Sequence, residues 1–255
     1  MEMLKVEQVS KQFGEIRAID KVTFHVNKGE IVSIIGPNGA GKSTMLNLIT
    51  KVDVPTSGTI IYKSEIDISK IKMHQLVNQK IARTFQNIRL FEIDDMSVID
   101  NVLTGMHHLY HHGFLASSLR LPAARRNEKQ MRDKAYTVLE LFGIADQAHR
   151  PTNTLAFGER RLVELCRALV SDPEMIIMDE PAAGLNDAET EYFAETIKGI
   201  NKQGVTVLLV EHHMGLVMNI SDRIVVFNYG QKIAEGRPDE IKGNSEVKKA
   251  YLGDD

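Results

Sequence analysis

The sequence predicts an α/β protein built around a largely parallel sheet, and three observations lead to this prediction. Of the 255 residues, 43% are apolar and 25% are charged, which is an ordinary globular composition and excludes a disordered chain. Short apolar runs typical of buried strands alternate with helical patterns, and this alternation favours parallel strands joined by right-handed crossovers. One strand is followed by a glycine-rich loop and then by a helix, an arrangement that favours phosphate binding.

The first quarter of the chain is expected to form short strands and one helix. Strands are predicted at residues 4–6, 22–26, 30–35 and 59–62, where β-branched and other apolar residues gather. The run 30–35 shows no polar alternation beyond Ser33, as expected for a strand that is covered on both faces. The helix that follows carries four apolar residues close to one face, so it should pack on the sheet: Met45, Leu46, Leu48 and Ile49.

A helical insertion is predicted at residues 97–142. Ser97, followed three residues later by Asp100, resembles a capping box that opens a helix. Pro122 suits the first turn of a second helix. An apolar stripe runs along that helix: Met131, Ala135, Val138, Leu139 and Phe142. The α/β alternation then resumes with a helix at 158–170, a strand at 175–178, a helix at 188–201 and a strand at 205–210.

The charge balance and the single cysteine exclude several classes of protein. The 31 Lys and Arg residues against 34 Asp and Glu residues give a net charge of −3, which offers no global reason to bind nucleic acid or an anionic membrane. Cys166 alone excludes a disulfide framework and a Cys-rich zinc site, and its position on an apolar stripe predicts a buried structural thiol. No apolar run approaches the roughly 20 residues that span a bilayer, and the first ten residues contain no apolar signal core, so we expect no export. We therefore expect a soluble cytoplasmic protein, or one held at a membrane by a partner.

The glycine-rich loop predicts a phosphate site. It fits the pattern G-x-x-x-x-G-K-[ST] and lies between a buried strand and a helix, as a P-loop must. Its residues are Gly36, Pro37, Asn38, Gly39, Ala40, Gly41, Lys42 and Ser43, with Thr44 following. Glycines allow the backbone to approach phosphate oxygens, and the amides at the helix N-terminus supply partial positive charge. Lys42 should reach the β- and γ-phosphates, and the Ser43 hydroxyl should complete the Mg²⁺ shell.

Two adjacent acids complete the predicted site. Asp179 and Glu180 follow the four apolar residues of the strand at 175–178. Asp179 is expected to hold Mg²⁺ through water, and Glu180 is expected to polarise an attacking water as a general base. Acids also terminate strands and cap helices for structural reasons, but the pairing with the P-loop favours the metal and base roles.

With these two segments in place, the chain resembles the ATP-binding subunits of ABC transporters over essentially its whole length. Phe13 resembles the aromatic residue that stacks on adenine, although a lone Phe also fits a core position. Gln86 is similar to the glutamine that meets Mg²⁺ and the attacking water, and His212 is similar to the histidine that contacts the γ-phosphate. The resemblance implies hydrolysis of Mg²⁺-bound ATP, with four residues in catalysis: Glu180, His212, Gln86 and Lys42.

A further segment resembles the signature loop of this family, which has the sequence Leu-Ser-Gly-Gly-Gln and caps the nucleotide of the opposite subunit. The corresponding residues depart from that sequence at three positions and keep one glycine: Ala156, Phe157, Gly158 and Glu159. The lost Ser hydroxyl removes one hydrogen bond to phosphate, worth about 1.5–3 kcal/mol when it is charge-assisted. Asn186 occupies a position that is usually Asp and is expected near the dimer seam.

Within the family, the chain is most similar to the LivG type of branched-chain amino-acid importer ATPase. This similarity rests on residues 83–91, on the aromatic residue before Gly158 and on residues 179–186. It implies a P-loop NTPase fold with a RecA-like core and an antiparallel β subdomain, both within residues 1–87 and 166–235. A helical ABC subdomain is implied at about 88–165 and a C-terminal tail at 236–255.

The resemblance also implies partners. These are integral-membrane permease subunits, a second ATPase subunit that is either a sister chain or a second copy, and indirectly a substrate-binding protein. The protein would then lie at the cytoplasmic face of the cell membrane and power amino-acid uptake, with no nucleic acid involved. Two alternatives stay open at this stage: the ATPase of a lipopolysaccharide or lipid exporter, and a soluble ABC ATPase that acts on nucleic acid or ribosomes.

Overall fold

A computed structural model describes every residue except 87, 89, 92–94, 108–121 and 253–255. The chain forms two compact units. The first unit joins Met1–Gln86 to Glu174–Asp255, and the second spans Asn87–Pro173. The helix α5 (Phe157–Leu169) lies wholly in the second unit, although it crosses the division expected near residue 165.

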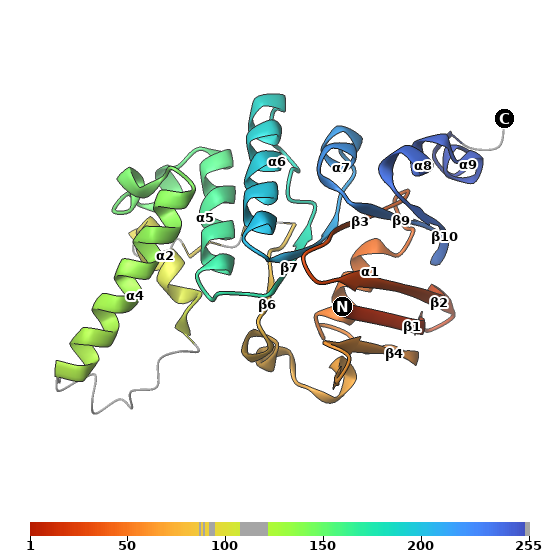
Figure 1. Ribbon diagram of the computed structural model, residues 1–255, viewed down its shortest axis with the longest axis horizontal. Coiled ribbons are helices and arrows are strands. Elements are labelled where there is room, and N and C mark those ends of the chain that lie inside the picture. The colour runs from red at the N-terminus through yellow and green to blue at the C-terminus, as the bar shows by residue number, and fades with distance from the viewer. Residues whose placement is uncertain (87, 89, 92–94, 108–121, 253–255) are drawn as a thin grey trace. The chain divides into compact units, whose positions relative to one another are not determined.

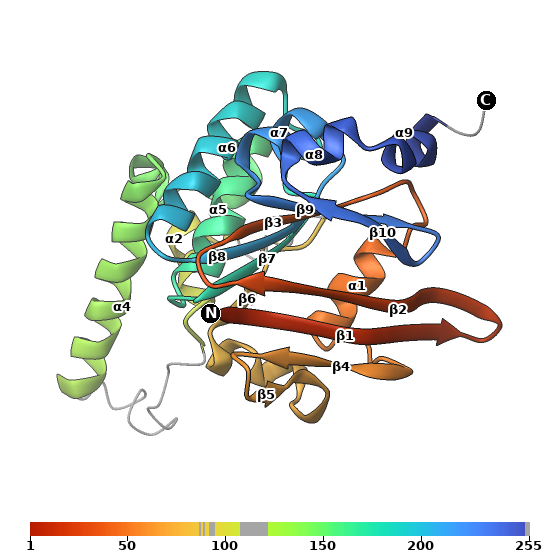
Figure 2. The ribbon, with the colours of Figure 1, turned by 45° about the vertical axis from the view of Figure 1, so that its right-hand side comes forward.

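The first unit contains two sheets (Figures 1 and 2). An antiparallel sheet has the strand order β2-β1-β4-β5, with β1 at Glu2–Phe13, β2 at Ile16–Asn27, β4 at Ser57–Tyr62 and β5 at Ile66–Asp67. The other sheet has the order β10-β9-β3-β8-β7-β6, with β3 at Ile31–Ile35, β6 at Ile81–Arg83, β7 at Met175–Asp179, β8 at Thr206–Val210, β9 at Arg223–Asn228 and β10 at Gln231–Gly236. The predictions of a buried parallel sheet and a separate antiparallel sheet are confirmed.

Only the β9–β10 pair breaks the parallel pattern among the described strands of the larger sheet. Two residues connect these strands, Tyr229 and Gly230, and both have positive φ, 44° and 77°. A two-residue turn with positive φ at both positions matches the twist of an antiparallel hairpin. The chain therefore turns back at once, without a crossover helix.

Helices cover both faces of the larger sheet. They are α1 (Lys42–Ile49), α6 (Asp187–Lys202), α7 (Met214–Ile220), α8 (Pro238–Gly243) and α9 (Ser245–Leu252). Figure 2 shows α1 between the two sheets, and α6, α7 and α8 on the opposite face of the larger sheet. On that opposite face, Ile35 packs in one buried cluster with Val217 of α7, Ile241 of α8 and Val247 of α9.

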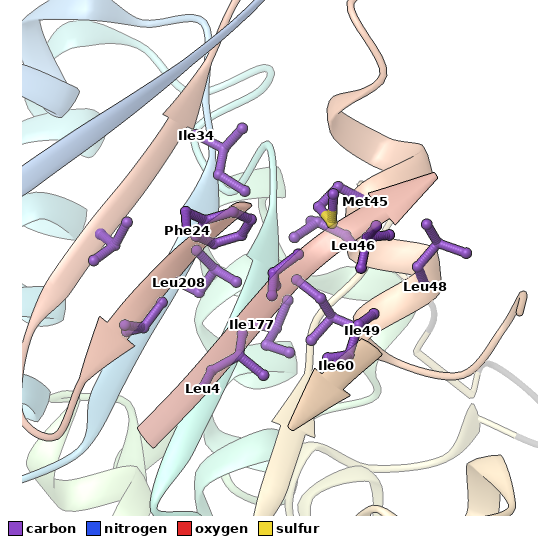
Figure 3. Close-up of a cluster of buried hydrophobic side chains, with 14 of the residues drawn as sticks. Leu4, Phe24, Ile34, Met45, Leu46, Leu48, Ile49, Ile60, Ile177 and Leu208 are labelled. Atoms are coloured by element: carbon purple, nitrogen blue, oxygen red, sulfur yellow. The ribbon is translucent and has the colours of Figure 1, made fainter. Parts of the chain in front are cut away.

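The main core lies between the two sheets and encloses α1. Figure 3 shows side chains from both sheets and from α1 pointing toward one another, among them Leu4, Phe24, Ile34, Met45 and Leu208. The predicted apolar face of α1 is fully buried. Because each such side chain contributes about 1.5–3 kcal/mol on burial, the core fixes β3 and α1 firmly, and with them the loop that joins the two elements.

The second unit is helical in its described part. It contains α2 (Val98–Thr104), α4 (Pro122–Leu141) and α5. Ser97 caps α2, and its hydroxyl accepts a hydrogen bond from the Asp100 amide at 3.3 Å, as predicted. Cys166 on α5 is fully buried, and burial raises the pKa of its thiol, so the predicted structural thiol is confirmed.

No helix in the described part of the chain combines the length and hydropathy that a bilayer crossing requires.

Candidate active site

The loop between β3 and α1 requires glycine at two positions. Gly36 has φ +152°, and a Cβ atom there would lie 2.1 Å from the backbone oxygen of Phe227. Gly41 has φ +97°, and its Cβ would lie 2.6 Å from the backbone oxygen of Ala18. Side chains cannot occupy such spaces, so the glycines allow the loop to curve tightly against β2 and β9. The loop ends at the N-terminus of α1, where free backbone amides favour an anion.

Lys42, the first residue of α1, turns its side chain back toward this loop. Its Nζ atom donates hydrogen bonds to the backbone oxygens of Gly36 at 2.7 Å and Pro37 at 2.9 Å. The residue is only 5% exposed. Burial lowers the pKa of Lys42, while the nearby carboxylates of Glu180 and Asp179 act in the opposite direction. The structure therefore places a buried cation beside the curved loop and close to the two predicted acids.

Asp179 ends β7 with one oxygen free for a cation. Its Oδ2 atom lies 3.2 Å from Nη2 of Arg83, whereas Oδ1 is buried and has no hydrogen-bond partner among the described residues. Burial raises the pKa of Asp179, and the Arg83 guanidinium opposes this shift. A buried carboxylate oxygen without a partner fits a hydrated Mg²⁺ ion, which prefers oxygen ligands.

Arg83 is a site residue to which sequence reasoning assigned no role. Besides the Asp179 contact, its Nη1 atom donates to the Thr50 hydroxyl at 2.5 Å, and its guanidinium lies 4.9 Å from the ring centre of Phe85. These three contacts hold the guanidinium in one position and thereby orient the Asp179 carboxylate.

The structure brings three predicted catalytic residues together. The Glu180 carboxylate accepts hydrogen bonds from Nε2 of Gln86 at 2.6 Å and from Nε2 of His212 at 2.5 Å. The Glu180 backbone has φ +47°, which is uncommon for a residue with a side chain. Its amide donates to the Val210 oxygen at 2.9 Å, so the end of β8 secures this conformation. The turn in the backbone gives Glu180 different partners from those of Asp179.

Phe13 and Asn186 lie at the ends of their elements. Phe13 ends β1 and is 47% exposed, with the Lys11 ammonium 4.6 Å from its ring centre, so the core interpretation of this residue is wrong. Asn186 caps α6, and its side-chain oxygen accepts from the Glu189 amide at 3.0 Å. The side-chain oxygen of Asn186 is therefore engaged in a hydrogen bond at the start of its own helix.

The signature-like residues begin α5 in the second unit. Ala156 is the N-cap, Phe157 is 48% exposed, and Gly158 lies in the first turn. Glu159 accepts hydrogen bonds from the Ala156 amide at 2.9 Å and from Nε2 of Gln147 at 2.7 Å. These two donors hold the pKa of Glu159 below its ordinary value. One half of a capping box is thus present, and the half that needs a Ser or Thr hydroxyl is missing.

The geometry agrees with the protein family whose model matches this sequence. The model described as ABC transporter matches residues 19–183, which include the loop, Gln86 and both acids. The chain belongs to the ABC transporter family. It is a nucleotide-binding ATPase whose hydrolysis of ATP is coupled to transport.

Relatives of this ABC ATPase match it over nearly its full length. The high-affinity branched-chain amino acid transport ATP-binding protein LivG of Salmonella typhimurium is 42% identical over 253 residues, which cover 99% of this chain and 98% of LivG. A second family model, branched-chain amino acid ATP-binding cassette transporter, matches residues 231–255. The solved structure of an ATP-binding cassette of an ABC transporter in its ADP conformation has a TM-score of 0.86 and 33% identity, with 100% of both chains covered. A dimeric cassette in a post-hydrolysis state with ADP and Pi has a TM-score of 0.76 and 28% identity, covering 92% of this chain and 99% of that chain.

Introducing Ser at position 156 is expected to stabilise the start of α5 in this ABC ATPase. The backbone there already has the extended N-cap conformation, with φ −63° and ψ 159°. A Ser hydroxyl could accept the amide that Ala156 leaves without a side-chain partner, for a gain of about 1 kcal/mol. Hydrogen exchange of the first-turn amides should then slow by roughly fivefold. Ala168→Ser, inside the same helix, is the control and should slow no exchange; equal exchange in Ala156→Ser and the native chain would contradict the prediction.

Proposed function

We propose that this chain is the ATP-hydrolysing subunit of a transporter for branched-chain amino acids. The observation that carries the proposal is the 42% identity to LivG across 99% of the chain. The match of residues 231–255 to the branched-chain amino acid cassette model supports the same substrate class. As a subunit of such a transporter, the chain would lie at the cytoplasmic face of the cell membrane through its partners.

The nucleotide would bind along the first unit. The exposed ring of Phe13 offers a surface on which adenine can stack, and the loop of residues 36–44 would cradle the phosphates with its backbone N–H groups, which Pro37 lacks. Ser43, Gln86 and Asp179 would hold Mg²⁺, and the unpartnered Oδ1 of Asp179 supports this assignment. When bound, the metal would neutralise charge on the phosphate oxygens.

The hydrogen-bonded cluster of Glu180, Gln86 and His212 would carry the chemistry. The Glu180 carboxylate would accept a proton from the attacking water as the water's oxygen bonds to the γ-phosphorus and the ADP oxygen departs. Gln86 would orient that water. Lys42 and His212 would donate hydrogen bonds to the γ-phosphate and balance the charge that develops there.

A second ATPase subunit, either a sister chain or another copy, would complete the site. The backbone amides that begin α5 at residues 157–159 would face the nucleotide held by that subunit, and Asn186 would lie near the seam. The similarity to a dimeric cassette supports such a pair. ATP-dependent closure and reopening of the pair would then move the membrane permeases, which receive substrate from a binding protein.

Uptake and co-purification together test the proposal. A strain lacking this gene is expected to lose high-affinity uptake of radiolabelled leucine, and the native gene should restore it while the Glu180→Gln variant should not. Lysine uptake is the control and should be unaffected. The tagged chain, purified from detergent-solubilised membranes, should bring down permeases and a second ATPase. Normal leucine uptake in the deletion strain, or recovery with ribosomes or DNA and no membrane protein, would overturn the proposal.

A further inference from the structure

Glu211 is a buried carboxylate that accepts three backbone hydrogen bonds. It directly follows β8 and is 3% exposed. Its Oε1 atom accepts from the amide of Ala182 at 2.7 Å, and its Oε2 atom accepts from the amides of His212 at 2.8 Å and His213 at 3.1 Å. Within the described residues, no Lys, Arg or His side chain forms an ion pair with it. A buried charge is costly unless it is well hydrogen-bonded, so these amides explain how the carboxylate is tolerated.

The three amides belong to two separate segments of the chain, one that follows Glu180 and one that contains His212. Ala182 lies two residues after Glu180. The amide of Ala183 donates a hydrogen bond to the backbone oxygen of Glu180 at 3.1 Å, so residues 180–183 form a turn that contains Glu180 and Ala182. His212 supplies the imidazole that contacts the same Glu180. One side chain therefore fastens the turn that carries Glu180 to the loop that carries His212.

We propose that Glu211 is a positioning residue that sets the distance between Glu180 and His212 by accepting hydrogen bonds from the backbone amides of Ala182, in the turn that follows Glu180, and of His212. The inference rests on the proposed roles of those two residues. The Glu180 turn has a strained backbone, and its amide is held by Val210, the residue that precedes Glu211. Strain of this kind persists only where neighbouring contacts enforce it. Glu211 provides such a contact on the C-terminal side of the turn, through Ala182.

A carboxylate suits this position better than its neutral analogue. Both of its oxygens are acceptors, whereas a Gln side chain offers one acceptor oxygen and one NH₂ donor. In a Glu211→Gln variant, the NH₂ group must face at least one backbone N–H, and that contact is repulsive. The turn and the loop should then shift apart while the overall size of the side chain is kept.

The first test compares kinetics and stability in the full-length chain. Glu211→Gln is expected to lower the turnover number for ATP hydrolysis by about 10- to 100-fold, with the KM for ATP within about threefold of the native value, because positioning acts on the chemical step. Glu211→Asp keeps the charge on a shorter stem and should be intermediate, which preserves the test if the Gln variant folds poorly. The matched control is Glu30→Gln, since Glu30 also accepts a backbone amide, from Asn27 at 2.7 Å, and pairs with Arg223. This control should lower the melting temperature and leave turnover unchanged.

A double-variant comparison separates positioning from a structural role. If Glu211 acts through Glu180, the Glu180→Gln/Glu211→Gln variant should hydrolyse ATP no more slowly than Glu180→Gln alone, within about threefold. Radiolabelled phosphate release gives the sensitivity that these slow rates need. Two outcomes would overturn the inference and leave the proposed function intact. In the first, the fold-loss of turnover in the double variant equals the product of the losses in the two single variants. In the second, Glu211→Gln has normal turnover while Glu180→Gln is inactive. Full turnover in Glu180→Gln would instead remove the proposed role of Glu180, and with it the positioning role of Glu211.

Discussion

Replacing Glu180 with Gln is expected to lower the turnover number for ATP hydrolysis by about 10²- to 10⁴-fold while ATP still binds. The Gln side chain has nearly the same size and can still form hydrogen bonds with Gln86 and His212. It cannot accept a proton from water, because its amide has no basic oxygen at neutral pH. The loss should therefore fall on the chemical step and not on nucleotide affinity.

Two measurements separate these effects. Steady-state phosphate release gives the turnover number, and a fluorescent ATP analogue gives the dissociation constant, which should change by less than about threefold. The matched control is Glu191→Gln on the exposed surface of α6, which removes the same charge from the chain without touching the cluster. Native turnover in Glu180→Gln would show that another group accepts the proton.

The sequence was sufficient to predict the parts of the fold that depend on local signals. The strand β3, the glycine loop and α1 follow one another within residues 31–49, and each has a sequence pattern of its own. The strand is a continuous apolar run, the loop is rich in glycine, and the helix has an apolar face. The strands β1 and β2 were predicted at residues 4–6 and 22–26, yet each has 12 residues. Register shifts occur at four places along their pairing and break the polar–apolar alternation, so the pattern shows only the regular part.

The grouping of the site residues could not be predicted from local patterns. Gln86 and Glu180 are 94 residues apart, and His212 and Glu180 are 32 residues apart, yet each pair is hydrogen-bonded. Neither spacing carries a signal, so Gln86 and His212 were found through the resemblance to a family and not through their chemistry. Arg83, whose side chain is 10% exposed, and Glu211, which is buried, are charged residues that look like surface charges in the sequence. What identifies them is a set of long-range partners, which only the folded chain provides.

Replacing Lys42 with Ala is expected to weaken ATP binding by roughly 10- to 150-fold, the equivalent of one charge-assisted contact worth about 1.5–3 kcal/mol. The ammonium group is nearly buried and lies beside the loop carbonyls of Gly36 and Pro37. Phosphate oxygens that enter this loop would gain a donor that water screens poorly, because the site is partly desolvated. Without Lys42, the carboxylates of Asp179 and Glu180 would also repel the phosphates more strongly.

The position of Lys42 predicts which phosphate groups of the nucleotide determine the loss of affinity in the Lys42→Ala variant. If the ammonium meets the β- and γ-phosphates, the variant should lose affinity for ATP and ADP but bind AMP as the native chain does, since AMP lacks those groups. Equilibrium titration with the three nucleotides measures this difference, and Lys28→Ala, an exposed lysine in a turn, serves as the control for lost charge. Equal weakening for AMP and ATP would mean that the substitution deforms the whole loop, and unchanged ATP affinity would remove Lys42 from the phosphate site. A selective loss would place the cation at the outer phosphates, where hydrolysis needs it.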